Sequence, residues 1–324
     1  MKRLLVFSGA LLWCAQVLAQ TVSVVVVGDI MLEGGPLRAM QKGRDPFASF
    51  APLFKSADVR VGNLECVVAT VGSVEPDKPN TFRVPPTTLK YVRKHFDAVG
   101  LANNHSGDYG RQAFAEMLGL LSKHQLAQAG GGMNLSEVHA PWIVERNGLR
   151  IAILSYSEFM PRSYEADSDA PGIAWSEDAQ VVDDIRRARR VHRADIVLPL
   201  MHWGWENEPM ANARQRQLAK RMIDAGADAV LGGHPHVTQD IEIYQGKPIV
   251  YSVGNFIMKE TDNPQQRQGW VLRMDITAAG VQGFDTHVAQ LNSQGLPTYD
   301  PGTPSPCWRQ SEPDIRQCRA SQAP

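Results

Sequence analysis

Several features that the sequence lacks narrow its function before any motif is considered. A formal net charge of -1 over 324 residues gives no electrostatic reason to expect a nucleic acid or an acidic membrane surface as a partner. The chain has no glycine-rich nucleotide-binding loop, which argues against ATP-driven ligation by this chain alone. Beyond the N-terminus, no stretch is apolar over the ~20 residues that a membrane span needs. The 43% of hydrophobic residues instead predict a globular protein with a sizeable core.

The N-terminal residues predict an export signal over residues 1–19. A basic start precedes a mostly apolar run over residues 4–18, and the small side chains of Val17 and Ala19 stand where a signal peptidase reads. Cleavage would leave Gln20 as the first residue. We therefore expect a periplasmic or extracellular protein, the alternative being an uncleaved membrane anchor.

Cysteine is also rare, with four residues in the chain. Cys307 and Cys318 lie close together in a Pro-rich segment over residues 292–324, which we expect to be a surface tail following a main domain over residues 20–291. In an oxidising compartment the two should form a disulfide. Cys66 follows an apolar run, and we interpret it as a small buried residue rather than a nucleophile.

Apolar, β-branched runs alternate with helical patterns, which predicts a layered α/β fold. The strand-like runs cover residues 22–27, 58–61, 98–102, 151–155, 195–200 and 227–231. Apolar residues recur at helical spacing around residues 114–121, 181–188 and 218–225. Turn signals at Asn147-Gly148 and Gln245-Gly246 indicate hairpins, and residues 270–276 and 281–288 have the pattern of an antiparallel pair. The sheets are therefore expected to be mixed.

Polar residues capable of binding a metal follow most of these apolar runs. They are Asp29, Asn63 and Glu65, Asn104 and His105, His202, His234 and His236, and Asn255. In α/β sheets, ligands bind at the carboxyl ends of the strands, where these side chains would gather. Imidazoles, carboxylates and amide oxygens form a set suited to Zn, Mn or Fe rather than Ca. The sequence therefore predicts a site for a divalent transition metal.

The same segments resemble a known family. The strings are Gly28-Asp29-Ile30-Met31, Gly62-Asn63-Leu64-Glu65, Ala102-Asn103-Asn104-His105 with Asp108-Tyr109-Gly110, Phe82-Arg83-Val84-Pro85-Pro86, His202-Trp203-Gly204, Gly233-His234-Pro235-His236-Val237 and Tyr251-Ser252-Val253-Gly254-Asn255-Phe256. In this order, from about Val22 to Val288, they resemble the CapA proteins of poly-γ-glutamate capsule synthesis. The resemblance implies the four-layer αββα sandwich of calcineurin-like metallophosphoesterases, with a two-metal site.

The resemblance also implies a role for each site residue. The implied metal ligands are Asp29, Glu65 as the carboxylate that bridges or caps the metals, Asn104, His202, His234 and His236. His105 resembles the catalytic histidine, and we expect Arg83, Asn63, Glu206 and Asn255 on the substrate side. Arg83 suits an anionic group because its planar guanidinium can bind a carboxylate or phosphate with two hydrogen bonds. The alternatives are a solvated surface arginine at position 83 and a Glu206 that orients His202.

One position departs from the metallophosphoesterase pattern. Phosphoesterases of this fold usually open with Asp-x-His, whereas here the third residue is Met31, which has no ligating nitrogen. CapA proteins share this feature. We therefore leave open whether one ion binds or two with unequal affinity.

Together these features predict an exported CapA-like protein of capsule biosynthesis. We expect a metal-dependent hydrolase that acts on or handles poly-γ-glutamate or a related anionic cell-envelope polymer. The expected partners are an anionic polymer or small anionic substrate and other capsule-synthesis or envelope proteins, with no nucleic acid. Two alternatives stay open at this point: a general extracytoplasmic metallophosphoesterase, and a non-catalytic polymer-binding module.

Overall fold

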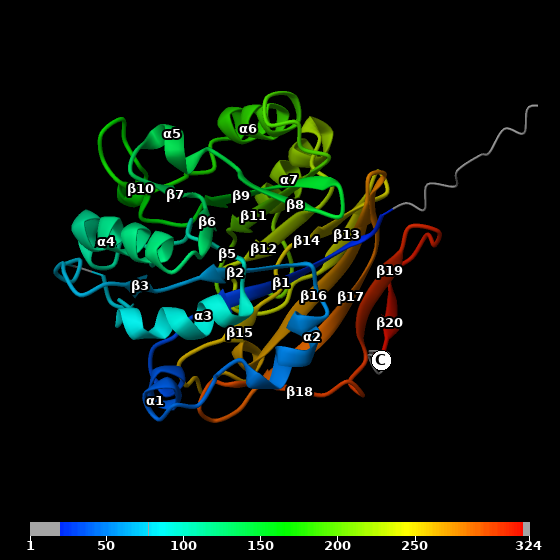
Figure 1. The fold of residues 1–324 in the computed structure, drawn as a ribbon. Coiled ribbons are helices and arrows are strands. Elements are labelled where there is room, and N and C mark those ends of the chain that lie inside the picture. The colour runs from blue at the N-terminus through cyan, green and yellow to red at the C-terminus, as the bar shows by residue number, and fades with distance from the viewer. Residues whose placement is uncertain (1–19, 77, 320–324) are drawn as a thin grey trace, which may run out of the picture.

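The computed structural model describes residues 20–76 and 78–319 and consists of two large β-sheets packed face to face between helices (Figure 1). The larger sheet has the strand order β20-β19-β17-β16-β1-β2-β5-β6, with β15 paired to β1 and β18 paired to β17. Its strands are β1 (Val22–Ile30), β2 (Val59–Leu64), β5 (Ala98–Gly100), β6 (Ala127–Ala129), β15 (Asn255–Ile257), β16 (Gln268–Thr277), β17 (Gly280–Leu291), β18 (Pro297–Tyr299), β19 (Ser305–Arg309) and β20 (Arg316–Cys318).

The smaller sheet has the order β13-β14-β12-β11-β9-β8. Its strands are β8 (Trp142–Arg146), β9 (Leu149–Ser157), β11 (Ile196–His202), β12 (Val230–Gly233), β13 (Ile241–Tyr244) and β14 (Lys247–Val250). Two short pairs lie outside both sheets: β3 (Val67–Val68) with β4 (Arg83–Val84), and β7 (Gly131–Gly132) with β10 (Gly172–Ile173). The hairpins β8–β9, β13–β14 and β16–β17 are antiparallel, as the turn signals predict.

Strand β1 shows why the apolar runs are continuous. Val22, Val24 and Val26 pack into the core between the two sheets, while Val25 and Val27 pack on the opposite face against helices. Successive side chains of a strand point to opposite faces, so a strand covered on both faces needs apolar residues throughout.

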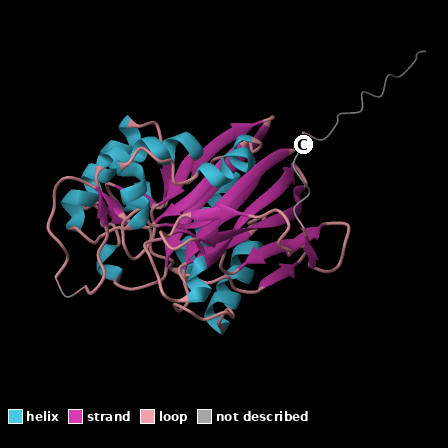
Figure 2. Ribbon diagram, turned by 90° about the horizontal axis from the view of Figure 1, so that it is seen from below, coloured by secondary structure: helices cyan, strands magenta, loops and turns pink. Residues whose placement is uncertain are grey.

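The outer faces of both sheets are covered by helices, which makes four layers (Figure 2). The helices are α1 (Gly35–Gln41), α2 (Ala51–Lys55), α3 (Leu89–His95), α4 (Gly110–Lys123), α5 (Leu135–Val138), α6 (Asp178–Arg190) and α7 (Ala213–Ala225). Residues of α1 to α4 pack on the larger sheet, and residues of α6 and α7 pack on the smaller one. The mixed α/β architecture and the αββα layering are therefore those that the sequence predicts.

The C-terminal segment differs from the surface tail expected over residues 292–324. It contributes β18, β19 and β20 to the larger sheet, and Trp308 is buried against Phe284 of β17. The strands are only three to five residues long, and the Pro- and Ser-rich composition around them does not show a strand pattern. Cys307 and Cys318 form a disulfide between β19 and β20, as predicted.

The export signal expected over residues 1–19 lies outside the described residues. Within the part of the chain that the structure describes, no helix is long and apolar enough to cross a membrane.

Candidate metal centre

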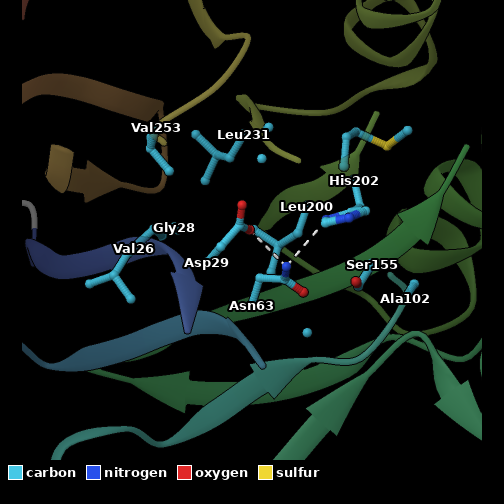
Figure 3. Close-up of a pocket in the computed structure, with 15 residues that line it drawn as sticks. Val26, Gly28, Asp29, Asn63, Ala102, Ser155, Leu200, His202, Leu231 and Val253 are labelled. Atoms are coloured by element: carbon cyan, nitrogen blue, oxygen red, sulfur yellow. Dashed lines mark hydrogen bonds between the residues drawn. The ribbon is translucent and has the colours of Figure 1, made fainter. Parts of the chain in front are cut away.

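The predicted metal ligands lie where the two sheets meet, at the carboxyl ends of parallel strands. In the larger sheet Asp29 of β1 stands beside Asn63 of β2, and Glu65 directly follows β2. In the smaller sheet His202 ends β11 and stands beside Gly233 of β12. Figure 3 shows Asp29, Asn63 and His202 pointing toward one another from the two sheets. The parallel arrangement therefore gathers side chains that are far apart in the sequence.

One group of ligands contains two carboxylates and one imidazole. Asp29, Glu65 and His236 each offer a ligand atom within 4.8 Å of the others, and all three are buried. Nδ1 of His236 lies 3.2 Å from Oδ2 of Asp29, and its Nε2 lies 3.8 Å from Oε1 of Glu65. We call this group the aspartate half of the centre.

A second group contains one carboxylate and two imidazoles. Glu65, His202 and His234 also lie within 4.8 Å of one another and are buried. Nε2 of His202 is 3.4 Å from Oε1 of Glu65 and 3.1 Å from Nδ1 of His234. We call this group the histidine half. Glu65 therefore belongs to both halves and would contribute to an ion bound at either.

The turn that carries two of the histidines has an unusual backbone. His234 and His236 adopt positive φ angles of 92° and 59°. Such conformations cost about 1–3 kcal/mol for residues other than glycine and are retained mainly at functional sites. A Cβ at Gly233 would lie 2.9 Å from Oδ1 of Asp29, so only glycine lets this turn approach the carboxylate closely. The Gly-Gly-His-Pro-His string thus brings both imidazoles to the ends of the larger sheet.

Amide side chains hold the ligands in place. Asn63 donates from Nδ2 to Oδ1 of Asp29 at 2.8 Å, and the same nitrogen lies 3.2 Å from Nδ1 of His202. Oδ1 of Asn255 lies 2.9 Å from Nδ1 of His236. Asn63 and Asn255, which we expected on the substrate side, therefore contact the ligands directly and are placed to orient them. Oδ1 of Asn104 lies 2.7 Å from Nε2 of His202, which places it at the histidine half.

The electrostatics of the centre are dominated by burial. Burial, followed by the charge of Asp29, raises the pKa of Glu65 well above its ordinary value. Burial and the other histidines lower the pKa values of His202 and His234 well below theirs. Burial also acts to lower the pKa of His236, but Glu65 and Asp29 outweigh it and raise that pKa to about 10. The pKa shifts of Glu65, His202 and His234 thus each favour the neutral form of the side chain.

A divalent cation fits this donor set. Both carboxyl oxygens of Glu65 and Nε2 of His234 are buried without a hydrogen-bond partner among the described residues. Buried polar atoms are costly unless they are paired, and oxygen and imidazole donors at this spacing are the ligands that a transition metal prefers. Met31 is buried in the apolar core and supplies no donor, yet each half still has three ligands.

His105 lies beside the ligands and is oriented by an acid. Its Nδ1 is 2.8 Å from Oδ2 of the fully buried Asp108, which leaves Nε2 as the ring nitrogen for a substrate. His105 and Asn104 line a cleft of about 400 Å³, together with Lys78, Phe159, Tyr164 and Glu206. The ring of Phe159 lies 3.8 Å from that of His234, so this cleft reaches the histidine half.

The structure places the two remaining expected residues differently from each other. Glu206 lines the cleft, on the exposed turn after β11. The Arg83 guanidinium stacks 4.2 Å from the Tyr109 ring and donates to the main-chain oxygens of Val71 and Gly72. Those contacts hold the Arg83 side chain on the surrounding loop. Among the described residues, Arg83 contacts none of the six expected metal ligands.

Sequence patterns gave no role to two groups that contact His105. Asp108 is part of the Asp-Tyr-Gly string, and its spacing of three residues from His105 is the signal that could have assigned it. Lys78 lies in an irregular segment between β3 and β4, and nothing local marks it.

Comparison with known proteins identifies the family. A family model described as bacterial capsule synthesis protein PGA_cap matches residues 23–260. The chain belongs to this family. Within it, the chain is 34% identical over 254 residues to the PGA biosynthesis protein CapA of Bacillus subtilis (strain 168), covering 77% of this chain and 64% of that protein. It is 29% identical over 295 residues to the capsule biosynthesis protein CapA of Bacillus anthracis, covering 89% and 70%. The chain thus spans less than two thirds of the first of these relatives.

Solved structures show the fold of this PGA_cap chain. The NAD nucleotidase of Haemophilus influenzae superposes with a TM-score of 0.50 and 14% identity over 87% of this chain and 60% of that one. At this identity the likeness shows the fold alone, and it agrees with the four-layer αββα sandwich of the two sheets and their helices.

Proposed function

We propose that this protein is an exported, metal-dependent hydrolase that acts on or handles poly-γ-glutamate or a related anionic polymer of the cell envelope. Membership of the capsule synthesis family supports the polymer, and the buried ligand set supports the metal. The bound metal is one or two transition ions, of Mn, Zn or Fe. Other capsule-synthesis or envelope proteins are the partners we propose.

The observation that carries the proposal is the position of Glu65. It is fully buried, belongs to both ligand groups, and has no hydrogen-bond partner for either oxygen in the described chain. A purely structural carboxylate in that position would be expected to accept hydrogen bonds, as Asp108 does. The unpaired oxygens therefore support a metal-binding centre at this position.

The arrangement around the centre favours hydrolysis. When bound, a divalent cation supplies Lewis-acid chemistry, because it polarises a carbonyl or phosphoryl oxygen and acidifies water. Asn104 contacts His202, and the next residue in the chain is His105. Because Nδ1 of His105 contacts Asp108, its Nε2 remains for the leaving group of a substrate. His105 is thus placed to protonate the leaving group in the cleft. Such general-acid catalysis typically contributes about 10²–10⁴-fold to a rate.

The test is a hydrolysis screen of the metal-loaded protein on poly-γ-glutamate, γ-glutamyl oligomers and phosphoesters. We expect cleavage of a γ-glutamyl substrate, and a rate lower by about 10²–10⁴-fold in His105→Ala with unchanged metal content. Turnover of phosphoesters alone would replace the polymer hydrolase by a general metallophosphoesterase. Metal-loaded protein that binds polymer without cleaving any substrate would leave a binding module.

A further inference from the structure

Lys78 reaches the proposed active site from a loop that the sequence motifs do not include. It lies between β3 and β4, and its side chain is only 14% exposed. Its ammonium contacts Oδ1 of Asp108 and the main-chain oxygen of Asn104, and lies 3.3 Å from Nδ1 of His105. A lysine so deeply placed is not an ordinary surface charge.

Asp108 explains why a cation is needed at this position. Its carboxylate is fully buried and accepts from the Phe82 main-chain nitrogen at 2.7 Å, while its Oδ2 also lies 2.8 Å from Nδ1 of His105. A buried carboxylate is unstable in its ionised form unless a charge compensates it. Lys78 supplies that charge on the second oxygen, Oδ1, so Oδ2 stays available to His105.

The contact geometry also decides which atom His105 uses. Because Oδ2 of Asp108 is the acceptor in this contact, Nδ1 of His105 carries the hydrogen, and the nearby ammonium of Lys78 is itself a donor. The Lys78 ammonium and the His105 ring therefore both donate to Asp108 rather than to each other. The consequence is a ring held with Nδ1–H toward Asp108 and Nε2 toward the cleft.

We propose that Lys78 is a positioning residue of the hydrolytic site, which holds the Asp108 carboxylate in place and thereby fixes the orientation of the His105 ring. This inference rests on the proposed function. Lys78 also lines the cleft, but two of its three donor directions are taken by Asp108 and Asn104, and we assign its effect to Asp108 rather than to the substrate. Removing it should therefore lower kcat and leave KM nearly unchanged.

The kinetic test uses Lys78→Cys with chemical restoration of the charge. The test uses a chain in which Cys14 is replaced by Ser. Among the described residues the other cysteines do not interfere, since Cys307 and Cys318 form a disulfide and burial raises the pKa of Cys66 to about 12. We expect kcat to fall by roughly 10–100-fold, as for other residues that orient a catalytic group. Alkylation of the introduced thiol with 2-bromoethylamine, which recreates an ammonium of similar length, should restore most of it, whereas iodoacetamide should not. A raised KM with kcat retained would show direct substrate binding and overturn the proposal, as would equal rates with either reagent.

A second readout does not need turnover, so it separates this inference from the proposed function. In ¹⁵N-labelled protein we expect the His105 ring to show a protonated Nδ1 with a downfield proton, lost or shifted in Lys78→Met and in Asp108→Asn. Lys123→Met is the matched control, because Lys123 ends α4 on the surface, about 20 Å along the helix from its start. An unchanged His105 spectrum in Lys78→Met would contradict the proposal even if the wild-type protein hydrolyses its substrate. A changed spectrum in a protein that cleaves nothing would keep Lys78 as the positioning residue and reject only the hydrolase.

Discussion

The two halves of the candidate metal centre share Glu65 but differ in charge. The aspartate half adds Asp29 and His236, and its carboxylates raise the pKa of His236 to about 10. The histidine half adds His202 and His234, whose pKa values are lowered well below the ordinary value by burial and mutual proximity. A positive charge is therefore favoured in the first half and disfavoured in the second.

This difference bears on the number of ions. Two carboxylates in a buried setting compensate a divalent cation far better than one carboxylate with two neutral rings. We infer that the aspartate half binds its ion more tightly, and that the histidine half fills at higher metal concentration. Met31, buried in the apolar core, supplies no donor to either half.

The largest effect is expected from Glu65→Ala, which removes the residue common to both halves. We expect loss of all tightly bound metal and a rate indistinguishable from background, because each half is left with two donors. Elemental analysis and the hydrolysis assay measure both. Glu208→Ala, an exposed glutamate on the turn after β11, is the matched control. Retention of a full metal complement in Glu65→Ala would break the shared-ligand account.

The next effect separates the halves. Asp29→Asn should abolish the tighter of two binding steps, whereas His202→Ala should abolish the weaker one and leave one ion per chain. Isothermal titration with Mn²⁺ on metal-free protein distinguishes the two outcomes. If both variants lost the same step, the two groups would form a single mononuclear site.

A smaller effect is expected from Asn63→Ala, since Asn63 contacts Asp29 and His202 but is not itself one of the grouped ligands. Loss of such an orienting contact typically weakens metal affinity or activity by about 10–100-fold. Titration should show both steps weakened, because Asn63 lies between the halves. An effect on one step alone would show that it orients only one ligand.

The smallest effect, for a change of one pH unit, concerns protons. With its pKa raised to about 10, His236 is protonated at neutral pH in the metal-free protein and must lose that proton to bind a cation. Affinity at the aspartate half should therefore rise with pH up to about 10, by about tenfold per unit for each proton released. Calorimetry in two buffers of different ionisation enthalpy counts the protons. Proton release that persists in His236→Ala would assign it to another group.

The sequence predicts the parts of this account that follow from strand periodicity and from motifs at strand ends. The continuous apolar run of β1 predicts a strand covered on both faces, and the strings around Asp29, His202 and His234 place their side chains at one edge. The loops around the site are less predictable because their geometry is set by tertiary contacts. Lys78 reaches Asp108 across 30 residues, and Arg83, despite its motif, turns to Tyr109.

The C-terminal strands illustrate a second limit. β19 and β20 are short and contain Pro306 and several polar residues. β19 pairs with β17, β20 pairs with β19, and the Cys307–Cys318 disulfide joins the two. Local composition therefore resembles a loop, whereas the long-range pairing makes a sheet.

The central claim is a buried metal centre built from two ligand groups around Glu65. The most direct test is elemental analysis of protein exported and purified without chelators, beside a His202→Ala, His236→Ala double variant that removes one imidazole from each half. The account predicts one or two transition-metal ions per chain in the wild-type protein and none in the double variant. A wild-type protein that holds no metal, and takes up none when Mn, Zn or Fe is added, would contradict it.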